Sequence, residues 1–151
     1  MTYTASPKTE ESSSPLIWNP NAAANWCLIF TPAFGAYLHA LNWRALGESE
    51  QAAKSMTWFY VAIGLLVLYT VLAVAIPNAK AAEGLSRLMG FVFLISWYYA
   101  NARLQAKYVK DKFGTAYIRR SWGKPLGYAL AGLLGYLIFS SVVGLIGAFL
   151  T

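Results

Sequence analysis

Residues able to perform acid–base chemistry are few in this chain, and they do not gather. It has 151 residues, with six acids, one histidine and one cysteine. A hydrolase needs a nucleophile beside a base, and an ion-coupled transporter needs an ionisable or strongly polar group deep in the membrane. No acid lies inside an apolar segment, since all six occupy the N-terminal region or the connections: Glu10, Glu11, Glu48, Glu50, Glu83 and Asp111. The pattern predicts no catalytic residues and no enzyme, leaving only loop carboxylates such as Glu48 and Glu50 open to chemistry.

A metal or cofactor site is also not expected. His39 and Cys27 have no His, Cys or acid at the spacing that metal ligands need. The glycine-rich phosphate loops, the serine-hydrolase elbow and the zinc-protease motif are absent from the sequence. His39 is therefore expected to be structural or interfacial, and Cys27 is expected to be a small buried hydrophobic residue.

The apolar content decides the class of protein. The chain is 58% hydrophobic and 12% charged, whereas an average soluble domain has about 25% charged residues. A soluble fold of this size could not bury so much apolar surface. Residues 56–76 carry no charge, and a helix of that length covers about 31 Å, close to the hydrocarbon thickness of a bilayer. The sequence predicts an integral membrane protein.

Four apolar segments, residues 22–41, 56–76, 85–102 and 126–150, predict an all-α membrane helical bundle. The last three are expected to span. In the first, Pro32 and Gly35 are expected to kink the helix. This segment is either a kinked span, which we favour, or a re-entrant hairpin bent at Pro32. Residues 1–21, rich in Ser, Thr and Pro, are expected to be a flexible tail, and residues 22–151 a single transmembrane domain.

Basic residues predict the orientation. With four spans, the side that holds residues 103–124 carries nine lysines and arginines, and the other side carries three. The positive-inside rule then places residues 103–124 in the cytoplasm and the N-terminus outside. If residues 22–41 do not span, the N-terminus is inside instead. The cytoplasmic position of residues 103–124 is the same under both interpretations.

The basic connection 103–124 is expected to meet anionic lipid headgroups. Arg103, Lys107 and Lys110 fall on one face of a helix that continues from the third segment and ends near Gly114. An acidic cytoplasmic partner is the alternative, and nucleic acid is not expected, because basic clusters beside spans are ordinary in membrane proteins. The expected headgroup contacts are Arg103, Lys107, Lys110, Lys112, Arg119, Arg120 and Lys124.

Two rows of small residues mark the last segment as a packing helix. Such rows let another helix backbone come close in a membrane. We favour packing against the protein's own second and third segments, and the alternative is a seam with another membrane protein or a second copy. The rows are Gly127, Ala131 and Gly135, and Ser140, Gly144 and Ala148.

Residues 19–48 read NPNAAANWCLIFTPAFGAYLHALNWRALGE. With its NW, TPAFGA and LHA-NW-LG pattern, this segment resembles a stretch found in small, uncharacterised bacterial multi-span inner membrane proteins. The resemblance covers about a fifth of the chain. It implies a bacterial inner membrane protein and a specific shape for the first segment, closer to the hairpin than to a straight span. It implies no catalytic or ligand residues.

Binding is the function that these patterns favour. Packing rows and a basic loop are present while coupling groups are missing, as is typical of an accessory or regulatory subunit, or of an immunity protein that neutralises a membrane-directed toxin. The alternative is a small homo-oligomeric exporter or channel. Polar side chains would then face a shared pore: Asn25, Thr31, His39 and Ser96.

Overall fold

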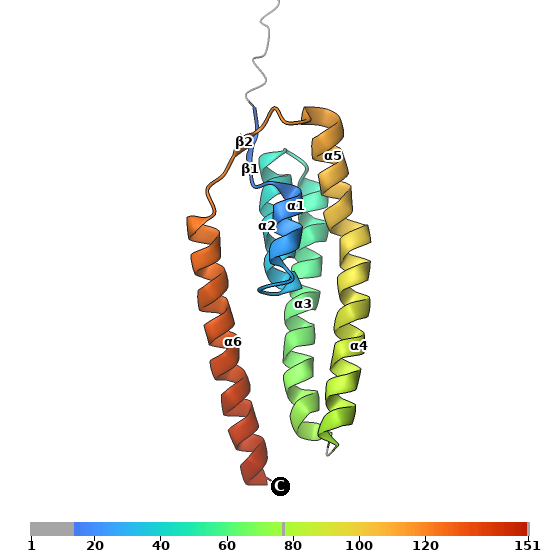
Figure 1. The fold of residues 1–151 in the computed structure, drawn as a ribbon, viewed down its shortest axis with the longest axis vertical. Helices are drawn as coiled ribbons and strands as arrows, with labels where there is room; N and C mark the ends of the chain where they lie inside the picture. Colours follow the sequence, from blue (N-terminus) through green and yellow to red (C-terminus); the bar gives the residue numbers. More distant parts are fainter. Residues whose placement is uncertain (1–13, 77, 151) are drawn as a thin grey trace, which may run out of the picture.

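The computed structural model describes residues 14–76 and 78–150. Helices account for most of this part of the chain (Figure 1). The elements follow one another as β1 (Leu16–Ile17), α1 (Pro20–Trp26), α2 (Pro32–Ala45), α3 (Ser49–Ala75), α4 (Ala79–Trp97), the π-helix η1 (Tyr98–Ala102), α5 (Arg103–Phe113), β2 (Ile118–Arg119) and α6 (Gly123–Leu150). The all-α prediction is confirmed, apart from one pair of two-residue strands.

Two helices, α3 and α6, are long and apolar enough to cross a membrane. They contain the predicted segments 56–76 and 126–150. The predicted segment 85–102 lies in α4 and η1, which run on into α5 without a break. Its role as a third span stays a prediction. Helix α5 ends at Phe113. Gly114 follows with a φ of +56°, so the helix break predicted near Gly114 is confirmed.

The first apolar segment is a helix–turn–helix hairpin, so the favoured interpretation, a single kinked span, is not what the structure has. Helix α1 ends at Trp26, a turn follows, and α2 runs back beside α1 (Figure 1). Pro32 does not kink a helix but begins one. The Thr31 hydroxyl caps α2 by accepting from the Phe34 amide, and a proline fits the first helical position because no bond to its N–H is needed there.

The N-terminal segment is anchored at the same end as the basic connection. Ile17 and Trp18 are buried, so the flexible tail predicted over residues 1–21 does not include these two residues; residues 1–13 lie outside the described part. Strand β1 pairs in parallel with β2, with Leu16 opposite Ile118. Four spans would have put the tail opposite residues 103–124, whereas this pairing puts both on one side of the molecule.

The core lies where the hairpin meets α3 and the α4–η1 helix. Trp97 is fully buried there, together with Cys27, Ala36 and Phe93. A Cβ at Gly35 would stand 2.9 Å from the Trp97 ring, so the glycine lets the indole lie against the α2 backbone. Gly35, expected to loosen a kink, is instead a close-packing position.

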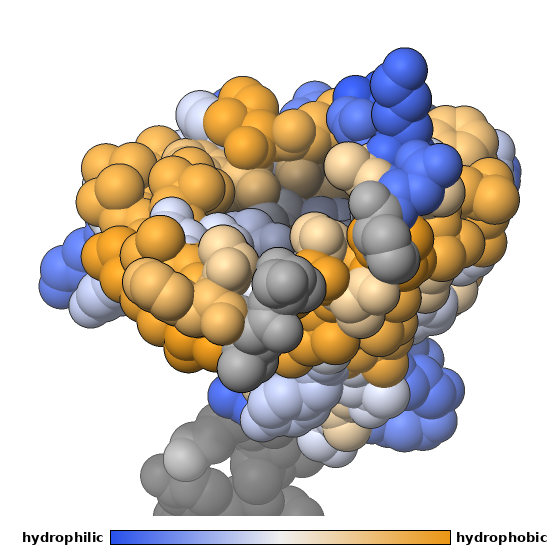
Figure 2. Space-filling model, turned by 90° about the horizontal axis from the view of Figure 1, so that it is seen from below, coloured by the Kyte–Doolittle hydropathy of each residue, from blue (hydrophilic) through white to orange (hydrophobic). Residues whose placement is uncertain are grey.

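Helix α6 lies to one side of this bundle (Figure 1). It contacts α3 and exposes most of its surface. It comes close to α3 at Gly147, where a Cβ would stand 2.3 Å from a methyl group of Val74. Figure 2, seen from the end opposite the strands, shows hydrophobic residues surrounding a hollow.

Candidate functional site

A buried amide holds the hairpin, the N-terminal segment and α5 together. The Asn42 side chain accepts from the Trp18 amide at 2.9 Å and donates to the Trp18 carbonyl at 2.8 Å. It also donates to Gln105 Oε1 at 3.1 Å, and Gln105 Nε2 donates to the His39 carbonyl at 2.8 Å. Asn42 and Gln105 are 1% and 0% exposed. Because a buried polar group left unpaired is costly, this network fixes the position of the hairpin.

A second polar contact joins α3 to the π-helix. Ser55 Oγ donates a hydrogen bond to Asn101 Oδ1 at 2.6 Å, and both side chains are buried. Within the described residues, three nearby groups have no hydrogen-bond partner: the His39 ring nitrogens, Trp97 Nε1 and Asn101 Nδ2. The His39 ring meets the Trp97 ring edge to face at 5.7 Å. The predicted structural role of His39 agrees with this packing.

A third contact ties the start of α3 to α5. The Tyr108 hydroxyl donates to Glu48 Oε1 and accepts from Lys112 Nζ at 2.7 Å. That hydrogen bond raises the pKa of Lys112. The Tyr108 ring also packs edge to face on Trp43. The sequence had left Glu48 as a carboxylate that could take part in chemistry; in the structure it makes a contact between helices.

An apolar groove of about 620 Å³ lies between α6 and the α2–α3 pair and is here called the α6 groove. Aromatic and aliphatic side chains form its walls. Its lining includes Phe34, Tyr37, Ile63, Val67, Ala129 and Leu133. At its lower end the Tyr136 hydroxyl reaches α3 and lies 3.3 Å from Thr70 Oγ1. A second hollow, of about 410 Å³, lies beyond Tyr136 between α3 and α6.

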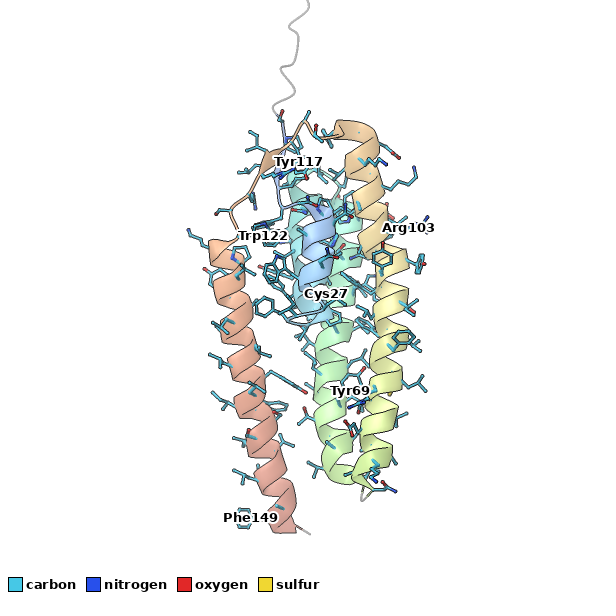
Figure 3. The ribbon with its side chains drawn as sticks, viewed as in Figure 1. Cys27, Tyr69, Arg103, Tyr117, Trp122 and Phe149 are labelled. Atoms are coloured by element: carbon cyan, nitrogen blue, oxygen red, sulfur yellow. The ribbon has the colours of Figure 1, made fainter. Side chains whose placement is uncertain are left out.

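The upper end of the α6 groove carries two basic residues, Arg120 and Lys124. Arg120 lies over the Trp18 ring at 4.8 Å, and its amide donates to the Ile17 carbonyl at 2.9 Å. Trp18 donates through Nε1 to the Ser121 carbonyl and packs against Trp122. Figure 3 shows Trp122 at the upper end of α6, on the side facing the hairpin. The strand pair and these tryptophans therefore fix the mouth of the groove.

The predicted headgroup residues separate into two groups. Helix α5 exposes Arg103, Lys107, Lys110 and Lys112, away from the groove. Arg119 ends β2, Arg120 follows it, and Lys124 lies at the start of α6. Ion pairs in the described residues join Lys54 to Glu50, Arg87 to Glu83 and Lys107 to Asp111. Both basic residues at the mouth are therefore without a carboxylate in that part of the chain.

The two rows of small residues have different surroundings. Gly127, Ala131 and Gly135 are exposed, and a Cβ at either glycine would meet nothing within 4 Å. This row does not pack within the chain. The second row does face α3, since its members line the hollow beyond Tyr136: Ser140, Gly144 and Ala148.

The residues predicted to face a shared pore do not share a surface. His39 is fully buried, and Asn25 and Ser96 are exposed on α1 and α4. The Ser96 hydroxyl donates to the Val92 carbonyl of its own helix. Thr31 caps α2. Their positions give the exporter or channel alternative no support.

Sequence reasoning missed the groove and most of the polar network. The spacing of Asn101 and Gln105, and of His39 and Asn42, was the available signal, because residues four and three apart share a helix face. Among the described residues, no three His, Cys, Asp or Glu side chains could hold a metal ion. Comparison of the chain with protein-family models, with curated proteins and with solved structures finds no match.

Proposed function

We propose that this protein is a non-enzymatic, multi-pass membrane protein that acts by binding a hydrophobic molecule inside the bilayer, in the α6 groove. One observation carries this function: α6 meets α3 near Tyr136 and Gly147 but leaves an apolar groove beside the hairpin. Large apolar pockets with a few convergent polar groups are where ligands bind. Such binding suits an accessory or regulatory subunit, or an immunity protein.

The proposed membrane arrangement follows from the helix lengths. Helices α3 and α6 cross the bilayer, the α4–α5 helix crosses beside them, and the α1–α2 hairpin enters from one side. The turn at the hairpin tip exposes Leu28 and Ile29, by 70% and 66%. Its amides bond to carbonyls of α1, as the Phe30 amide does to the Trp26 carbonyl at 3.1 Å. Non-helical backbone at membrane depth needs such partners.

The strand pair and the basic residues belong to the cytoplasmic end in this arrangement. Basic residues of the connection 103–124 would meet anionic headgroups there. Strand β1 lies on the same side, and the bacterial inner membrane suggested by residues 19–48 is the proposed location.

Photocrosslinking from two adjacent leucines tests the binding function. Leu133 lines the α6 groove, whereas Leu134 is 52% exposed on the outer side of α6. A diazirine analogue of leucine, which keeps the size of the side chain, is placed at each position and irradiated in native membranes, and the adducts are identified by mass spectrometry. We expect position 133 to give one dominant adduct and position 134 a mixture that follows the bulk membrane. Identical adduct distributions at the two positions would refute groove binding.

A further inference from the structure

We infer that the occupant of the α6 groove is one acyl chain of an anionic phospholipid, whose phosphate is bound by Arg120 and Lys124. This inference rests on the proposed function, because it names the molecule that the groove holds. Three features carry it: the length of the groove, its closure at Tyr136, and the charge at its mouth.

The length of the groove matches one leaflet. Its lining on α6 runs from Lys124 to Tyr136, which is about 18 Å at 1.5 Å per residue. One leaflet contributes about 15 Å to a hydrocarbon core of about 30 Å. The Tyr136 side chain reaches across to Thr70 and closes the groove at that depth. An occupant that enters at the basic end therefore ends near the middle of the membrane.

The closure of the groove favours a hydrocarbon chain over a helix. A spanning helix with its side chains is about 10–12 Å wide and would have to pass Tyr136, which reaches across to Thr70. A lipid tail can end at Tyr136, and the aromatic walls supply it with dispersion contacts.

The mouth supplies the charge that a phosphate needs. Arg120 is held from two sides, by its backbone bond to Ile17 and by its stacking on Trp18. Lys124 follows four residues later, at the start of α6, and neither basic residue has a carboxylate partner among residues 14–76 and 78–150. Arg and Lys bind phosphate oxygens through charge-assisted hydrogen bonds. Trp18 and Trp122 flank the mouth, and tryptophan prefers the level of the headgroups.

Titration with two lipids tests the headgroup. The purified full chain is stripped of lipid in detergent, titrated with phosphatidylglycerol or phosphatidylcholine, and examined by native mass spectrometry. We expect one phosphatidylglycerol per chain at the lowest concentrations. Each basic residue near a headgroup contributes about 1 kcal/mol, so replacing both mouth residues in R120Q/K124Q should reduce the preference for phosphatidylglycerol about thirtyfold. The matched control K80Q/R87Q removes two exposed charges from the first half of α4, away from the mouth of the groove, and should leave this preference unchanged.

A pair of glycine substitutions tests the groove itself. Gly132 lines the groove, Gly135 does not, and a Cβ at either would meet nothing within 4 Å. Gly132→Phe should fill the groove and abolish tight binding of the first lipid. Gly135→Phe adds the same side chain at an exposed position that is not part of the groove lining and should bind lipid as the wild type does.

The outcomes separate this inference from the function on which it rests. If Gly132→Phe abolishes binding but the wild type binds the two lipids equally, the assignment of an anionic headgroup is wrong and groove binding stands. A polypeptide or a second copy of the chain crosslinked from position 133 would also overturn the assignment of a lipid as the occupant. If both phenylalanine variants bind like the wild type, the lipid site does not exist, and identical crosslinking from positions 133 and 134 would then remove groove binding as well.

Discussion

Replacing Asn42 by alanine should release the N-terminal segment from the bundle. Three groups lose their partner: the Trp18 amide, the Trp18 carbonyl and Gln105 Oε1. Each buried group left unpaired costs about 1–3 kcal/mol. The N-terminal segment can detach and bind water instead, which limits the total to the lower end of the sum. We expect a loss of about 3 kcal/mol.

Hydrogen exchange measures this loss directly. A change of about 3 kcal/mol in local opening corresponds to a protection factor lower by about two orders of magnitude. The readout is the exchange of peptides that cover residues 14–19, followed by mass spectrometry in detergent. Asn25→Ala is the matched control, because Asn25 is an exposed asparagine of the same hairpin. In Asn25→Ala, the exchange of residues 14–19 should change by less than the equivalent of about 0.5 kcal/mol. If Asn42→Ala protects these residues as well as Asn25→Ala does, the network does not hold the segment.

The remaining predictions concern packing and orientation. Gly35→Val should lower the thermal midpoint in detergent, because its Cβ meets Trp97 at 2.9 Å, at a cost of about 1–3 kcal/mol; Gly64→Val, with open space around it, should not. Gly147→Val should separate α6 from Val74 and lower the same midpoint, whereas an equal effect of Gly144→Val would contradict this reading of the helix contact. In a Cys27→Ser background, cysteines replacing Ser14 and Thr115 should both be protected from an impermeant thiol reagent in intact cells, and one replacing Asn78 should be labelled. Labelling of position 14 without position 115 would refute the shared side implied by the strand pair.

Long uniform segments were readable from sequence because one physical requirement dominates them. Helices α3 and α6 follow from uninterrupted apolar length alone, and the end of α5 follows from a glycine able to adopt positive φ. The hairpin was harder, because a proline in an apolar run either kinks a helix or starts one. The deciding signal was the residue before it. Thr31–Pro32 and Asn19–Pro20 each place a capping side chain ahead of a first-turn proline.

The candidate site depends on long-range placement that no local pattern carries. Trp18 meets Ser121 across 103 positions of sequence, and Asn42 meets Gln105 across 63. The sequence predicted the basic residues of the mouth to be headgroup contacts, but it could not separate them from the basic residues on α5. That division depends on where α6 lies beside α2 and α3, which is set by the close approach at Gly147 and the Tyr136 contact.

The strand pair also sets an order of events during synthesis. Leu16 is made about 100 residues before its partner Ile118, so at about 5–20 residues per second the ribosome produces the partner roughly 5–20 s later. Throughout that interval the hairpin stays at the translocon or the membrane surface without the pairing of β1 with β2, while α3 and α4 emerge from the ribosome. Maturation of the N-terminal end is thus a late step that only the arrival of the last connection can complete.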